Sequence, residues 1–262
     1  MAPCLLFVGC QSRIIYFPRP YPPGHTERWQ KTTHGKLVTV ETSQGKQTGY
    51  LQGRLSAPRR LWIVCGGNGT VALDWSEWMQ DHAPREDAFL LVDFPGYGAN
   101  EGRPSPGGIR ESLGKMIPAA SLALGWPEKP EPAKLRIFGH SLGAAATLIA
   151  AADHGIQRGV ILSPFTSTMQ MARVMTGLPV GFLVVHRFDN EARLRQIAAR
   201  GTGKIVLFHG SQDEAIPVEM GRELGTNFAG LIEYREIPGA HHNDMPETHP
   251  GVISAAMRRV AE

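Results

Sequence analysis

Cysteine is scarce in this sequence of 262 residues, and its scarcity excludes two kinds of stabilising site. The three cysteines are Cys4, Cys10 and Cys65, an odd number whose spacings fit neither a disulfide framework nor a metal site. Runs of lysine and arginine are also lacking, and the formal net charge is only +3, so no nucleic-acid partner is indicated. No apolar segment reaches the ~20 residues that a membrane-spanning helix needs. The length and the 42% apolar content instead suit one large globular domain.

The first 26 residues differ from the remainder of the chain. Leu5 to Cys10 is a short apolar run that ends in Gly-Cys and resembles the lipobox of bacterial lipoproteins, although Phe7 stands where leucine is usual and no positively charged segment precedes it. The proline-rich stretch 17–24 is typical of a stiff tether. We therefore expect a signal or lipobox-like segment and tether over 1–26, with Cys10 lipidated at a bacterial cell envelope. A plain disordered start on a cytoplasmic protein is the alternative.

Residues 27–262 alternate apolar strand patterns with helical patterns. A hairpin is predicted over 36–51, and continuous apolar runs predict buried strands at 61–65, 88–93, 135–138, 159–162 and 204–208. Helices are predicted between them, and a last strand at 234–237 precedes a closing helix. This order predicts an α/β fold with a mostly parallel central sheet and helices on both faces. Ligands of such sheets bind beyond the carboxyl ends of the strands.

The motif Gly-x-Ser-x-Gly at 139–143 is the main functional signal. An apolar strand precedes it and a run of small residues follows it, so the chain reads as strand, sharp turn and helix. Such a turn strains the backbone at the serine and lifts its hydroxyl above the sheet. Gly139 and Gly143 lack a Cβ, which lets the strand and the helix approach closely. We therefore expect Ser141 to be a nucleophile.

A serine nucleophile needs a histidine base that is oriented by a carboxylate. Asp213 follows the strand 204–208, and the pair His241 and His242 follows the strand that ends near 237. The order Ser, Asp, His is the one that this type of fold uses. We expect Asp213 to be the acid, with Glu214 as the alternative, and His242 to be the base, with His241 as its competitor. Asp244 is expected to cap the next helix.

The negatively charged oxygen of an acyl-transfer intermediate needs preorganised donors. The backbone N–H of Leu142 is the first candidate because it follows the nucleophile. The second is expected from the loop Cys65-Gly-Gly-Asn-Gly, where Gly67 is preferred and Asn68 is the alternative. The glycines do not form a phosphate-binding motif, since no Gly-Lys-Ser/Thr follows them. Neither a metal nor an organic cofactor is required by this chemistry.

Several further segments make the resemblance to a known family specific. The chain resembles the α/β hydrolases, and within them it is similar to the Bem46-like serine hydrolases, which include the protein depalmitoylases of the α/β-hydrolase domain-containing 17 type and the domain-containing protein 13. The matching segments are Cys65–Gly69, Asp93–Gly98, Glu101–Ser105, Gly139–Gly143, Ser163–Ser167, Arg187–Asp189, His209–Glu214 and His242–Asp244. The resemblance implies a triad of Ser141, Asp213 and His242 that hydrolyses esters or thioesters. Cys65 departs from the family, which usually has histidine there.

The segment 168–200 occupies the place of a cap and can form only a small one. Its apolar run 178–185 is expected to be core or cap lining, with an acyl-chain or membrane-facing patch as the alternative. Tyr97 and the loop 94–105 are expected to be structural, with a substrate-wall role as the alternative. The main hypothesis is thus a serine hydrolase acting on a small-molecule ester or an acylated substrate. A catalytically silent binding protein of the same fold, or a lipase or peptidase, is the competing interpretation.

Overall fold

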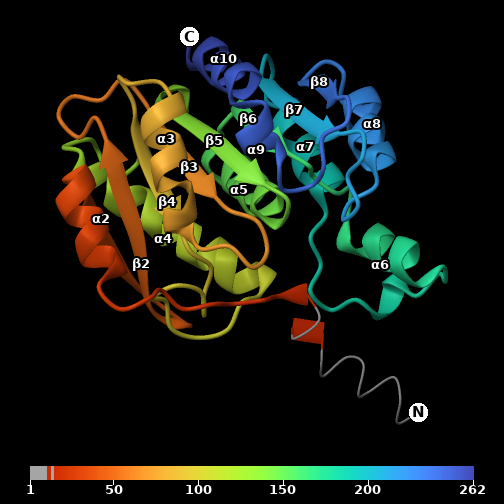
Figure 1. Ribbon diagram of the computed structural model, residues 1–262, viewed down its shortest axis with the longest axis horizontal. Coiled ribbons are helices and arrows are strands. Elements are labelled where there is room, and N and C mark those ends of the chain that lie inside the picture. The colour runs from red at the N-terminus through yellow and green to blue at the C-terminus, as the bar shows by residue number, and fades with distance from the viewer. Residues whose placement is uncertain (1–10, 13–14) are drawn as a thin grey trace.

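A single eight-stranded sheet organises the protein in the computed structural model, which describes residues 11–12 and 15–262. The strand order is β1-β2-β4-β3-β5-β6-β7-β8. β1 and β2 form an antiparallel hairpin and β2 is antiparallel to β4, whereas all later neighbours are parallel. The α/β fold with a mostly parallel sheet is therefore confirmed (Figure 1). The strands are β1 Lys36–Thr42, β2 Gly45–Gly53, β3 Leu61–Cys65, β4 Ala88–Val92, β5 Leu135–His140, β6 Arg158–Leu162, β7 Lys204–Gly210 and β8 Ile232–Ile237.

Helices cover both faces of this sheet. The helices are α2 His25–Thr33, α3 Ser76–His82, α4 Pro106–Ala123, α5 Leu142–His154, α6 Thr168–Thr176, α7 Asn190–Ala198, α8 Val218–Asn227, α9 Met245–Thr248 and α10 Pro250–Ala261, with short 3-10 turns η1 Ala72–Trp75, η2 Pro132–Lys134 and η3 Gly181–Leu183. The predicted strands and long helices are present, but α2 and α9 were not predicted. None of the helices that the structure describes is both long enough and apolar enough to cross a bilayer.

Alternation along the strands builds a separate hydrophobic core on each face of the sheet. In β3, Leu61, Ile63 and Cys65 pack into the core beneath α4, α5 and α7, while Trp62 and Val64 pack into the core beneath α2, α3 and α10. Successive side chains of a strand point to opposite faces, so a strand covered on both sides must be apolar throughout. This explains why the run 61–65 contains no polar residue. Cys65 is fully buried and burial raises the pKa of its thiol, which fits a packing role.

The N-terminal segment lies against the domain over the residues that the structure describes. The Tyr21 hydroxyl donates to Asp93 Oδ2 at 2.6 Å, and Pro20 forms a parallel bridge with Gly98. Tyr16 is 2% exposed and packs into the core beneath α4, α5 and α7, which we call the main core. Burial raises the pKa of Asp93 to about 7, although Tyr21 and the amide of Ala72 counteract it. Cys10, the expected site of lipidation, falls outside the described residues.

The segment expected as a cap contains two different parts. α6 and η3 lie beyond the sheet, and we call residues 168–188 the cap segment. α7 instead packs on α5, with Leu194 and Ile197 fully buried in the main core. The candidate residues follow the carboxyl ends of β3, β5, β7 and β8, and Ser141 and His242 line one pocket with residues of the cap segment.

Candidate active site

Ser141 sits on a strained turn between β5 and α5. Its backbone angles are φ 55° and ψ −118°, a combination that costs a residue with a side chain of the order of 1–3 kcal/mol. The close approach of strand and helix depends on two glycines: a Cβ at Gly139 would lie 2.6 Å from the Gly143 carbonyl oxygen, and a Cβ at Gly143 would collide with the Cys65 carbonyl. The packing of β3, β5 and α5 therefore holds the strained conformation in place.

The structure brings Asp213 and His242 together from loops that lie 29 residues apart. Asp213 follows β7 and His242 follows β8, two neighbouring parallel strands whose carboxyl ends share one edge. His242 Nδ1 donates to both carboxylate oxygens, at 2.8 Å to Oδ2 and 3.0 Å to Oδ1. The side chain of Asp213 is 0% exposed and that of His242 is 8% exposed. Because the buried Asp213 carboxylate accepts the hydrogen bond from Nδ1, the orientation of the His242 ring is fixed and Nε2 is the ring nitrogen that can take a proton.

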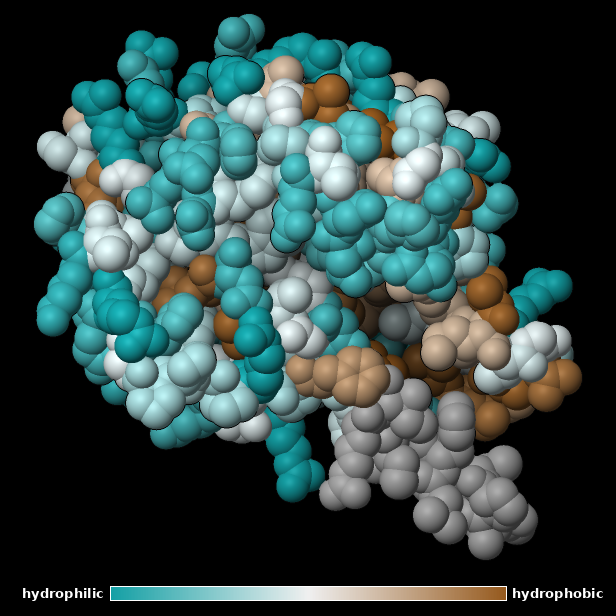
Figure 2. Space-filling model, in the orientation of Figure 1, coloured by the Kyte–Doolittle hydropathy of each residue, from teal (hydrophilic) through white to brown (hydrophobic). Residues whose placement is uncertain are grey.

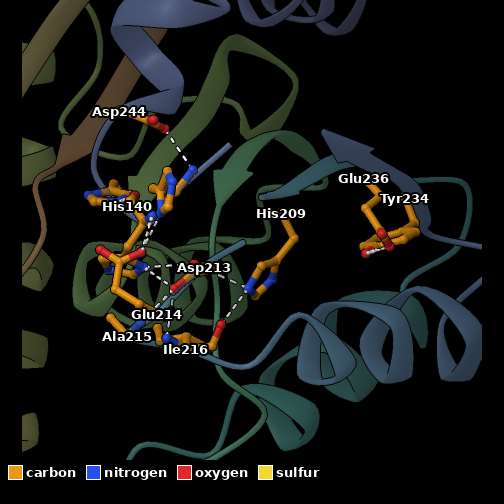
Figure 3. Close-up of polar contacts among 11 residues, drawn as sticks. His140, His209, Asp213, Glu214, Ala215, Ile216, Tyr234, Glu236 and Asp244 are labelled. Atoms are coloured by element: carbon orange, nitrogen blue, oxygen red, sulfur yellow. Dashed lines mark hydrogen bonds and ion pairs between the residues drawn. The ribbon is translucent and has the colours of Figure 1, made fainter. Parts of the chain in front are cut away.

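Asp213 is kept ionised by several donors. Its Oδ1 accepts the backbone N–H groups of Ala215 and Ile216, at 3.0 and 2.8 Å, and its Oδ2 lies 3.3 Å from His209 Nε2 (Figure 3). Burial opposes ionisation, but the hydrogen bonds from His209, His242 and Ile216 outweigh it and hold the pKa of Asp213 well below its ordinary value. The carboxylate is therefore an anion throughout the range in which a histidine titrates.

His209 was missed by the sequence analysis although it stands four residues before Asp213. It is 0% exposed, and its Nε2 lies 2.9 Å from the Ile216 carbonyl oxygen. Because a carbonyl can only accept, Nε2 carries the proton and also faces the Asp213 carboxylate. Its Nδ1 is buried with no partner among the described residues. His209 thus fixes the loop that presents Asp213. The sequence signals for it were its position at the end of an apolar strand and its place in the segment His209–Glu214, neither of which indicates this role.

The competing histidine and carboxylate pair with each other instead. His241 Nδ1 lies 3.2 Å from Glu214 Oε2, and both side chains are more than half exposed. Asp244 occupies the cap position of α9, but its carboxylate makes no helix-capping hydrogen bond and accepts the N–H of His241 at 2.8 Å. The expected capping role of Asp244 is therefore wrong, because the carboxylate turns back to brace the loop of His242.

His140, the second residue of the Gly-x-Ser-x-Gly motif, supports the same loop. Its Nε2 donates to the His242 carbonyl oxygen at 2.9 Å, and the two rings lie 4.9 Å apart between centroids. Burial, together with the nearby His242, lowers the pKa of His140 to about 4. A neutral ring at this place avoids a second cation beside the candidate base. The motif pattern carries no signal for this role, because it leaves the residue before the serine unspecified.

Ser141 and His242 line one pocket of about 430 Å³ together with Gly67 and Leu142. Within the described residues, no hydrogen bond joins the Ser141 hydroxyl to His242; such contacts are often long in unliganded enzymes and tighten with substrate. One side of the pocket is formed by the cap segment and the loop before α8. The apolar side chains of the lining are Ile15, Phe17, Leu142, Phe165, Met171, Ala172, Met175, Val184, Ala215 and Ile216.

The loop that carries Gly67 is anchored through its neighbour Asn68. The Asn68 Oδ1 accepts from the Tyr97 hydroxyl at 2.7 Å and from the Phe17 N–H at 3.0 Å, and its side-chain amide donates to the Ile15 carbonyl. Tyr97 is 1% exposed and therefore acts as a support, as the structural interpretation expected. Gly67 and Asn68 both line the pocket, and the side chain of Asn68 is bonded to Tyr97 and to the N-terminal segment. No group of three His, Cys, Asp or Glu side chains in the described part of the chain is placed to hold a metal ion.

Comparisons with known proteins agree with this architecture. The chain is 30% identical over 260 residues to an uncharacterised protein of Mycobacterium tuberculosis strain H37Rv. The aligned region covers 97% of this chain and 89% of that protein. It is 30% identical over 153 residues to human alpha/beta hydrolase domain-containing protein 17B, covering 58% of this chain and 49% of that protein. No protein-family model matches the sequence.

Solved structures share the fold at low sequence identity. The esterase Pf2001 of Pyrococcus furiosus superposes with a TM-score of 0.70 at 17% identity, over 95% of this chain and 98% of that one. An alpha-beta hydrolase from Vibrio vulnificus also gives a TM-score of 0.70, at 18% identity, over 91% of this chain and 88% of that one. The solved structures show that the chain has the α/β-hydrolase fold, and the match to the human protein over part of the chain identifies it as an α/β hydrolase that resembles alpha/beta hydrolase domain-containing protein 17.

Proposed function

We propose that the protein is a serine hydrolase that cleaves carboxylic esters or thioesters through an acyl-enzyme intermediate. One observation carries the proposal: an imidazole bonded through Nδ1 to a buried carboxylate lines the same pocket as a serine on a strained turn. The structural neighbour from Pyrococcus furiosus is an esterase, which supports the same class of reaction.

Each step follows from the placement of these groups. Ser141 Oγ attacks the acyl carbonyl while His242 Nε2 takes the hydroxyl proton, and the Asp213 anion stabilises the imidazolium that results. The carbonyl oxygen becomes an anion, and we assign its stabilisation to the backbone N–H groups of Gly67 and Leu142, which both line the pocket. His242 then protonates the leaving alcohol or thiol, and the acyl group stays on Ser141. A water molecule, deprotonated by His242, releases the acid and regenerates the serine.

The pocket supports an apolar acyl group as the part of the substrate that is bound. Its volume of about 430 Å³ lies within the ~300–1,000 Å³ typical of small-molecule sites. Most side chains that the cap segment and the loop before α8 contribute to the lining are apolar, and Ser141 and His242 line the same pocket. Burial of the acyl chain supplies affinity, and the few polar groups orient the carbonyl.

A fluorophosphonate probe tests the proposal because it labels only an activated serine. The wild-type protein should form one covalent adduct and turn over p-nitrophenyl esters and acyl thioesters. Ser141→Ala should abolish both while keeping the circular-dichroism spectrum, and Ser56→Ala, at an exposed loop serine, should change neither. An unlabelled wild-type protein would instead indicate a binding protein of the same fold, and an adduct on Ser141→Ala would refute the assignment of the nucleophile.

A further inference from the structure

Exposed apolar side chains concentrate on the cap segment. Ten large hydrophobic side chains are exposed among the described residues, and six of them fall within the 17 residues from 169 to 185. Met175 is 73% exposed and Phe182 is 67% exposed. We call these six side chains the cap patch: Met169, Val174, Met175, Leu178, Phe182 and Val185. A concentration of this kind marks an interaction surface, whereas single exposed apolar residues are normal.

Helix α6 carries apolar side chains toward both the pocket and the solvent, and its exposed side also carries Gln170 and Arg173. Met171 and Ala172 line the pocket, while Met169 and Val174 are exposed. A surface helix usually presents a polar face to water, and a group of large apolar side chains on that face marks an interaction surface. Figure 2 shows apolar surface gathered around α6, beside the hollow that leads inward. The outer side of α6 thus offers apolar side chains to a partner, next to polar and cationic ones.

Charge around the cap patch indicates what kind of partner fits. The sequence contains no aspartate or glutamate from 168 to 188, but it contains Arg173 and Arg187. Glu223 does reach α6, where it accepts a hydrogen bond from Gln170, but it comes from α8. An apolar surface interspersed with arginine suits a membrane interface, because the apolar groups enter the acyl boundary and the arginines contact anionic headgroups.

The first described residue of the chain is fixed to the cap segment. Gln11 donates to the Leu183 carbonyl oxygen at 2.6 Å and accepts the Val185 N–H at 2.7 Å, so it is fixed to the cap segment. Residues 1–10 contain no charged side chain and include the run Leu5-Leu6-Phe7-Val8. Gln11, which follows this run and Cys10 in the sequence, is thus fixed beside the cap patch.

We propose that the cap patch docks on a lipid bilayer that carries anionic headgroups. Docking through this surface orients the pocket toward the bilayer, since Met175 belongs to the cap patch and also lines the pocket. The orientation matters only if the proposed hydrolase function holds, in which case an acylated substrate could enter the pocket from the membrane surface. Docking itself depends on the patch and the arginines, and needs no catalysis.

Vesicle flotation tests the docking with the full 262-residue chain. Vesicles of phosphatidylcholine mixed equally with phosphatidylglycerol should carry the wild-type protein upward, and Ser141→Ala should float equally well. The double variant Leu178→Ser, Phe182→Ser should lose partitioning by on the order of tenfold, because binding scales with the apolar area inserted. Neither residue lines the pocket, so hydrolysis of a small soluble ester should persist. The matched control is Leu122→Ser on α4, whose side chain is 57% exposed.

Three results would overturn the proposal. The first is flotation of the double variant at the wild-type level. The second is an equal loss in Leu122→Ser, which would show a nonspecific effect. The third is self-association of the wild-type protein in light scattering without binding to vesicles, together with a monomeric double variant, because the patch would then be an interface between copies.

Arg173→Gln tests the role of charge. It should weaken flotation with the anionic vesicles and leave the weaker flotation with pure phosphatidylcholine unchanged; equal effects on both would contradict the role of charge.

Discussion

Replacement of Asp213 by asparagine tests the arrangement around the candidate base. The substitution keeps the size of the side chain but replaces one carboxylate oxygen with an NH₂ group. Oδ1 can still accept the N–H groups of Ala215 and Ile216, so the amide nitrogen must take the place of Oδ2. There it faces His242 Nδ1 at 2.8 Å and the protonated Nε2 of His209 at 3.3 Å. The amide NH₂ of the variant, which is a donor, thus faces the two N–H donors of His242 and His209.

The expected loss follows from the tautomer of His242. The nearer partner of Nδ1, at 2.8 Å, is then an amide N–H, which favours Nδ1 as an acceptor although Oδ1 remains 3.0 Å away. That tautomer places the proton on Nε2 and leaves the ring unable to deprotonate Ser141. In a serine hydrolase this costs on the order of 10³–10⁴ in kcat/KM, or about 4–5 kcal/mol of transition-state stabilisation. The imidazolium would also lose the buried anion that stabilises it.

Steady-state hydrolysis of p-nitrophenyl acetate and fluorophosphonate labelling rates measure the effect. Glu214→Gln is the matched control, because it neutralises the adjacent carboxylate, which is 62% exposed and pairs with His241. It should retain activity to within about threefold, since exposed ion pairs contribute little. The reasoning is refuted if Asp213→Asn keeps a tenth or more of the wild-type kcat/KM, or if Glu214→Gln loses more than Asp213→Asn.

Three further predictions concern the supports of the site. The pKa of His140 is about 4 in the folded protein and near 6.5 in the unfolded chain, so between these pH values the unfolded chain binds a proton that the folded protein does not. The free energy of unfolding, measured with urea, should therefore fall by up to about 3 kcal/mol as the pH drops from 6.5 to 4, and His140→Gln should show a smaller fall. Tyr97→Phe removes the hydroxyl that donates to Asn68, and should lower the free energy of unfolding by about 1–2 kcal/mol and kcat/KM by roughly tenfold. Unchanged values would show that Tyr97 does not support the loop that carries Gly67. Ser141→Gly should abolish turnover yet be more stable than Ser141→Ala by about 1 kcal/mol or more, because glycine relieves the positive φ; equal stability would show that the turn is unstrained.

Local patterns in the sequence accounted for much of the fold. Strands that are buried on both faces must be apolar throughout, so runs such as 61–65 and 88–92 could be identified without structural information. Helix α2 was missed because it lies next to a proline-rich stretch and buries only Trp29. Its mean composition is polar, and a single buried side chain gives no periodicity to detect.

The candidate site divides in the same way. Ser141 could be found because strand, turn and small-residue helix are adjacent in the chain, and Asp213 and His242 because each follows a strand in the order that the fold uses. His140 and His209 carry no comparable signal, since each acts through a backbone carbonyl of a loop whose path depends on the whole sheet. The sequence by itself therefore determined the strands, the motif and the order of the chemistry-bearing residues. Only the tertiary structure decided which histidine pairs with which carboxylate, how the N-terminal segment supports the loop of Gly67, and which side of the cap segment is exposed. The physical reason is distance along the chain: the contacts that hold these parts together join residues from 29 to 174 positions apart.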